Sequence, residues 1–134
     1  MSKRLQIIIF IVICLSGIVY AIFQRKQLEK NYLVSEGEIK NVEYTSKSTD
    51  YFVSYTFPEK EGTSKSSLPY VRFKDIVFLR TLLEGKKLFV VYQKDNRENN
   101  KMLFLGSDYK KYSITPSKEQ QKIIQSIDSL FENK

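Results

Sequence analysis

The sequence predicts an α+β protein. We expect an N-terminal transmembrane helix, then a small curved antiparallel sheet or partly open β-barrel with one inserted helix and one C-terminal helix. Three observations predict this architecture. Residues 5–23 are an apolar run without a charge. Residues 51–57 and 86–93 have the alternating or two-sided apolar pattern of strands. Residues 73–84 and 117–131 instead repeat their apolar side chains at helical spacing.

The apolar run has a basic pair at each end, Lys3 and Arg4 before it and Arg25 and Lys26 after it. As a helix rising 1.5 Å per residue it is roughly 28 Å long, close to the roughly 30 Å hydrocarbon core of a bilayer. A helix also satisfies its own backbone hydrogen bonds in lipid. We therefore expect a single-pass membrane anchor with the basic pairs at its two flanks.

A cleaved signal peptide is the main alternative to a retained anchor. Val19-Tyr20-Ala21 resembles a cleavage site, but the apolar run continues past it through Ile22 and Phe23, which favours retention. The basic residues on the two sides nearly balance, so the positive-inside rule gives little direction. Very short leading tails usually stay in the cytoplasm, and we therefore expect the C-terminal part outside it.

Small residues lie along one face of the anchor. Cys14, Gly17 and Ala21 follow at helical spacing, and Gly17 and Ala21 form a small-xxx-small pair that allows two helices to approach closely. This face predicts a possible helix dimer. The alternative is that Gly and Ala are simply common in membrane helices.

The chain divides into a tail (residues 1–4), the transmembrane helix (5–23), a juxtamembrane stalk (24–36) and a soluble α+β domain (37–134). The part beyond the anchor is large enough for one modest hydrophobic core. Its first strand is expected at residues 37–44, with a bulge near Lys40-Asn41 where the apolar parity shifts.

A polar turn at residues 45–50 leads to the clearest strand, 51–57. A loop at residues 59–63 and a short polar edge strand at 64–68 follow, and such an edge could accept a partner strand by β-augmentation.

The second half begins with the helix over residues 73–84, ended by Gly85 in the left-handed conformation. Residues 86–93 are apolar on both faces and predict a central strand. We expect a loop at 95–100 and a last short strand at 102–105. The C-terminal helix begins at Thr115-Pro116-Ser117, with Ser117 and Gln120 placed to form a capping box.

Composition excludes several kinds of chemistry. The chain has no histidine and a single cysteine, which lies inside the apolar run, so zinc sites built from Cys and His are ruled out. Lys and Arg number 22 against 15 Asp and Glu, but the charges are interspersed and no nucleic-acid-binding module accompanies them. We find no paired acids or nucleophile motif and predict no catalytic residue, cofactor or metal.

A family resemblance adds to this interpretation. The resemblance depends on the order of three features. They are Gly37-x-Ile39, then residues 51–57 with Tyr, Val, Tyr and Phe at every second position, then Gly85-Lys86 before the next strand and an Asn-rich loop. This pattern is similar to an uncharacterised family of small bacterial membrane-anchored β-domain proteins. The resemblance implies an extracytoplasmic β-domain on an anchor and brings no activity.

The functional hypothesis is therefore a non-enzymatic, membrane-anchored interaction module in the cell envelope. Its expected partners are the lipid bilayer, a possible envelope protein and a second copy of the chain, without nucleic acid. Two alternatives stay open: a small-ligand binder or enzyme with a Tyr- and Lys-lined pocket, and a membrane-surface or lipid-sensing domain acting through Arg25, Lys26, Lys30 and the C-terminal helix.

Overall fold

The computed structural model describes residues 2–44, 50–69 and 76–132. Most of the predicted polar turn and the start of the predicted helix at residue 73 lie outside these residues. The described elements are, in order, α1 (Lys3–Lys30), β1 (Tyr32–Tyr44), β2 (Asp50–Phe57), β3 (Lys60–Pro69), α2 (Ile76–Leu83), β4 (Lys87–Gln93), β5 (Asn96–Met102), α3 (Gly106–Lys111) and α4 (Lys118–Glu132).

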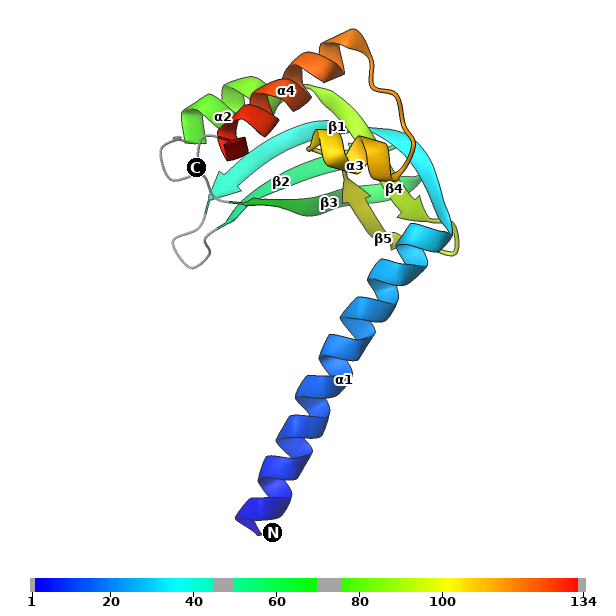
Figure 1. The fold of residues 1–134 in the computed structure, drawn as a ribbon, viewed down its shortest axis with the longest axis vertical. Helices are drawn as coiled ribbons and strands as arrows, with labels where there is room; N and C mark the ends of the chain where they lie inside the picture. The colour runs from blue at the N-terminus through cyan, green and yellow to red at the C-terminus, as the bar shows by residue number, and fades with distance from the viewer. Residues whose placement is uncertain (1, 45–49, 70–75, 133–134) are drawn as a thin grey trace.

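The long helix α1 projects from the rest of the molecule (Figure 1). Its first turn is capped by Ser2, whose side-chain oxygen accepts a hydrogen bond from the Leu5 amide at 3.2 Å. An 18-residue window of this helix has a mean hydropathy of 2.7 and none of it is buried. One helix is therefore long and apolar enough to cross a membrane, as predicted.

The helix runs directly into the sheet. It ends at Lys30, and β1 begins at Tyr32, five residues earlier than the predicted start of the first strand at residue 37. The added residues pair with β4, from Tyr32 opposite Gln93 to Glu38 opposite Lys87. Residues 32–36 of the predicted stalk are thus part of the sheet, because pairing with a distant strand outweighs their weak apolar alternation.

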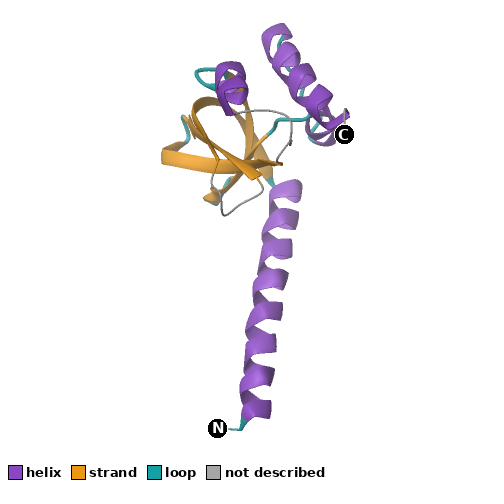
Figure 2. Ribbon diagram, turned by 90° about the vertical axis from the view of Figure 1, so that its left-hand side faces the viewer, coloured by secondary structure: helices purple, strands orange, loops and turns teal. Residues whose placement is uncertain are grey.

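Five antiparallel strands form a sheet in the order β3-β2-β1-β4-β5. The middle strand is β1, whereas we expected β4 there; β4 lies beside it and is paired on both sides. The predicted bulge occurs in β1 between Ile39 and Asn41. The first half of β1 pairs with β4 and the second half with β2, so the sheet coils on itself (Figures 1 and 2). The result is a nearly closed barrel, within the predicted fold class.

The two end strands, β3 and β5, differ from the prediction. β3 begins at Lys60 instead of residue 64, directly after the Pro58-Glu59 turn. β5 occupies Asn96–Met102, where we expected a loop, and residues 103–105 are not a strand. The polar, Asn-rich sequence of β5 has no local strand pattern. Its strand conformation comes from pairing with β4, for example Lys101 opposite Val91.

The end strands also meet each other. Within the described residues no backbone ladder joins β3 to β5; side chains bridge them, with the Met102 amide donating to Ser66 Oγ at 3.1 Å. Ser64 and Ser66 of the predicted edge therefore contact β5, and β-augmentation at residues 64–68 stays a prediction. We call this line of contact the closing seam.

The barrel interior is filled by large side chains, among them Tyr55, Ile39, Val90 and Met102, each fully buried. Outside the barrel, Tyr109 of α3 stacks edge-on against Phe89 of β4 at 6.3 Å between ring centroids. α2 contacts β1 and ends at Leu83, and Gly85 in the turn that follows has the predicted left-handed φ of +79°.

The C-terminal helix α4 confirms its predicted start and apolar stripe. The Ser117 amide donates to Gln120 Oε1 at 2.9 Å, and the Gln120 amide donates to Ser117 Oγ at 3.2 Å, which completes the capping box. The buried residues of the stripe are Ile123, Ile124, Ile127 and Leu130. α4 therefore uses its apolar face for packing on the molecule.

Candidate functional site at the junction of helix and barrel

The most distinctive site in the described chain is the junction where the last turns of α1 meet the barrel. α1 contacts β1, β4 and β5. Leu28 is the one buried residue of the helix, 6% exposed. Asn99 of β5 donates from Nδ2 to the backbone carbonyl of Gln24 at 2.9 Å and lies 3.1 Å from the Gln24 side-chain oxygen. The barrel is thus fixed directly to the end of the apolar segment.

A second contact joins the same end of α1 to α3. Lys111 Nζ donates to Glu29 Oε1 at 2.6 Å, and this hydrogen bond raises the pKa of Lys111. Next to it, Tyr32 and Tyr112 stack edge-on at 4.8 Å, and the Tyr32 hydroxyl donates to the Tyr112 carbonyl at 3.0 Å. Contacts from β5 and from α3 therefore hold the direction of the helix relative to the barrel.

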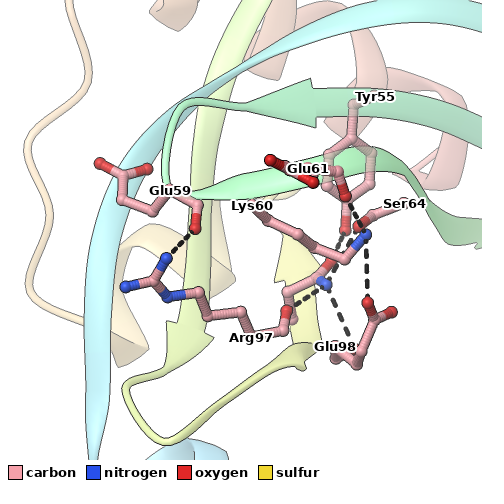
Figure 3. Close-up of polar contacts among 8 residues, drawn as sticks. Tyr55, Glu59, Lys60, Glu61, Ser64, Arg97 and Glu98 are labelled. Atoms are coloured by element: carbon pink, nitrogen blue, oxygen red, sulfur yellow. Dashed lines mark hydrogen bonds and ion pairs between the residues drawn. The ribbon is translucent and has the colours of Figure 1, made fainter.

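The start of β5 continues from the junction into the closing seam (Figure 3). Arg97 donates to the Glu59 carbonyl in the β2–β3 turn. Lys60, whose side chain is only 8% exposed, lies 3.5 Å from a Glu98 carboxylate oxygen. These paired groups tie the two end strands together near the junction and are not a free reactive cluster.

Inside the seam, Tyr55 is the centre of a buried polar network. Its hydroxyl donates to Asn100 Oδ1 at 2.5 Å and lies 2.9 Å from Ser66 Oγ. Asn100 Nδ2 in turn donates to Ser64 Oγ at 3.1 Å. Burial raises the pKa of Tyr55 to about 12, so the hydroxyl stays protonated and structural at neutral pH.

This pKa predicts a loss of stability at high pH. A tyrosine with an ordinary pKa near 10 ionises earlier in the unfolded chain than Tyr55 does in the folded one, so stability falls as the pH rises from about 10 to about 12. We expect Tyr55→Phe to make this fall shallower by up to about 1–3 kcal/mol. Urea unfolding across that pH range measures it, with half-exposed Tyr44→Phe as the control. An unchanged slope in Tyr55→Phe would contradict the assignment.

The clefts of the described surface bear on the small-ligand alternative. A cleft of about 510 Å³ between α3 and α4 is lined by Tyr109 and Lys110 among others. The Tyr109 hydroxyl, however, donates to the Leu103 carbonyl at 3.1 Å, and burial raises its pKa to about 12. A more polar cleft of about 360 Å³ contains Lys86, Lys87 and Glu119 and no tyrosine. Within the described residues no group of three acidic, His or Cys side chains is placed to hold a metal.

The residues selected from the sequence are far apart along α1. Lys3 and Arg4 are at its start and Arg25 and Lys26 near its end, and all four are exposed. Cys14, Gly17 and Ala21 are also exposed, and a Cβ added at Gly17 would meet nothing within 4 Å. The predicted helix-dimer face is therefore unoccupied by the described part of the chain, and dimerisation stays a prediction.

Sequence reasoning missed the residues that build the junction, above all Asn99, Glu29 and Lys111. They are separated by 75 to 82 positions from the residues they contact. Glu29 in the helix end and Lys111 beside a tyrosine carry no local signal for pairing, and only the fold brings them together.

Comparisons with known proteins add no relative. We found no matching family model, no similar curated protein and no similar solved structure for this chain, so the family resemblance noted from the sequence stays a prediction.

Proposed function

We propose that the chain is a single-pass membrane protein whose barrel is a non-enzymatic interaction module at the membrane surface, outside the cytoplasm in the cell envelope. The observation that carries this proposal is α1. Its large apolar residues from Leu5 to Phe23 are exposed along the helix, and nothing in the described chain covers them. Lipid is the solvent that such a surface requires.

The junction supports the module part of the proposal. A barrel joined to its anchor by a flexible linker would move freely, whereas here Asn31 alone separates α1 from β1. The hydrogen bond from Asn99 and the ion pair of Lys111 add contacts that are useful only if the barrel is to be held in one place. Holding a binding surface at a fixed distance from the bilayer suits an interaction role.

Retention and sidedness can be tested on the full chain. We expect alkaline washing to leave the intact protein in the membrane pellet and detergent to release it. With Cys14→Ser and Ser129→Cys, a single thiol on α4 should react with a membrane-impermeant maleimide in intact cells, because α4 is outside the cytoplasm. The matched control places the thiol at Ser2, which should react only after lysis.

Each outcome has a clear meaning. A mature chain that begins near Ile22 and is recovered in the supernatant would show a cleaved signal peptide and overturn the anchor. Labelling of the Ser2 thiol, with the Ser129 thiol protected, would keep the anchor and reverse the orientation. Labelling of the Ser129 thiol alone supports the proposal as stated.

A further inference from the structure

We propose that the junction binds the phosphate groups of anionic phospholipids, through Arg25 of α1 and Lys101 of β5. This inference rests on the proposed function, since lipid reaches the junction only when α1 spans the bilayer. It adds a partner of defined chemistry and a site built by the fold, beyond the basic pair that flanks the anchor.

The first step is the height of the junction above the hydrocarbon. The apolar run ends at Phe23, and Gln24 is the next residue. The headgroup layer is about 5–8 Å thick on each side of a bilayer. Residues 24–29 span about 8 Å of helix, so they cross this layer. Because Asn99 is hydrogen-bonded to Gln24 and Lys111 to Glu29, the adjoining parts of β5 and α3 are at headgroup height as well.

The charges of the side chains at the junction favour an anionic ligand. Glu29 is four residues after Arg25 on α1 and forms an ion pair with Lys111, and Lys101 is close enough to interact with it electrostatically. Lys111 is already engaged in a short ion pair with Glu29. Arg25 is exposed and Lys101 keeps 48% of its side chain exposed, although it lies 3.6 Å from Asp108. Long basic side chains at this height reach lipid phosphates readily.

Neighbouring residues strengthen the attraction. Lys26 and Lys30 are also exposed on the same end of α1, so the cations of the junction outnumber the carboxylates paired with them, Glu29 and Asp108. A basic surface held within the headgroup layer has acidic lipid as its complementary partner, because a soluble protein would have to displace that layer to reach it.

Lys101 is brought to the end of α1 by the fold of the barrel. This residue is two positions after Asn99 on β5, and the Asn99–Gln24 hydrogen bond holds that strand beside α1. A free helix end would offer only Arg25, Lys26 and Lys30. Lipid preference that depends on Lys101 and Asn99 is therefore a signature of the assembled junction.

The experiment uses the full chain reconstituted in phosphatidylcholine vesicles. Flotation after alkaline washing first tests whether the protein spans the bilayer. Electron spin resonance then measures how strongly spin-labelled phosphatidylglycerol is preferred over phosphatidylcholine at the protein boundary. We expect a preference of at least about fivefold at low salt, the factor that about 1 kcal/mol from a single basic residue gives. It should weaken between about 0.01 M and about 1 M NaCl.

Variants distinguish a lipid site at the junction from a general effect of the positive charge of the protein. Lys101→Gln, Arg25→Gln and Asn99→Ala should each lower the preference at least twofold, and Lys101→Arg should keep it. The matched control is Lys122→Gln, which removes the same charge from α4, an element far from the span in Figure 1. Inorganic phosphate should lower the preference for phosphatidylglycerol no more than chloride does at equal ionic strength.

The outcomes distinguish the inference from the proposal beneath it. A chain that floats but shows no lipid preference, or equal effects of Lys101→Gln and Lys122→Gln, overturns the lipid site and leaves the anchor standing. Stronger competition by inorganic phosphate assigns the site to free phosphate and overturns the lipid assignment. A chain that does not float overturns the anchor, and the lipid site with it.

Discussion

Replacing Phe10 and Ile13 together with arginine is expected to release most of the chain from the membrane fraction. Both side chains are inside the apolar run of residues 5–23, within four residues of its centre, and both are exposed, at 68% and 64%. An arginine near the centre of a membrane helix costs about 2.5–3.5 kcal/mol on insertion scales, so the pair costs roughly twice that. Quantitative blotting of pellet and supernatant after alkaline washing measures the change.

The control carries the same two charges at the end of the helix. Ser2→Arg with Gln6→Arg places arginines where their side chains reach the headgroups, and this variant should stay in the pellet. If the Phe10 and Ile13 double variant also stays in the pellet and still needs detergent for release, the barrel itself holds the chain on the membrane and the span does not.

Replacing Gly37 with alanine is expected to destabilise the barrel by about 1–3 kcal/mol, the usual cost of overpacking a filled core. Gly37 is in β1 and faces the interior. An added Cβ would lie 2.6 Å from Val90 Cγ2 and 2.9 Å from the end of Met102. The Met102 side chain can bend aside, but the branched Val90 side chain is stiff. Thermal unfolding should show a Tm lower by about 4–8 °C for each kcal/mol.

A double-mutant cycle makes this prediction specific to the clash. In a Val90→Ala background the crowding methyl is gone, so Gly37→Ala should cost clearly less there than in the natural chain. Equal costs in the two backgrounds would show that Gly37 is needed for another reason. Circular dichroism of the purified protein in detergent follows both transitions.

Much of the fold was predictable because local patterns and the final packing agree. The alternation of residues 51–57 gave β2, whose Tyr51, Val53 and Tyr55 are buried as expected. The parity change near Lys40 marked the bulge, and the spacing of Ser117 and Gln120 marked the start of α4. In each case the deciding interaction is within a few residues or follows from one buried face.

The rest was not predictable because its cause is distant in sequence. β5 has exposed or half-buried polar residues up to Met102, and its strand conformation comes from pairing with β4. The junction depends on Asn99 meeting Gln24, and the seam on Asn100 meeting Tyr55. A polar residue with its partner on a remote strand has the same local sequence as one in a solvated loop.

Because a single residue separates α1 from β1, the helix sets the rotational position of the barrel about the helix axis as well as its height. A helix turns about 100° per residue. One residue inserted after Phe23 would therefore swing every outward surface of the barrel by more than a quarter circle around the helix axis. Two copies that met along the Gly17 side would always bring the same surfaces of their barrels together. The length of the helix would then fix the rotation of one barrel relative to the other.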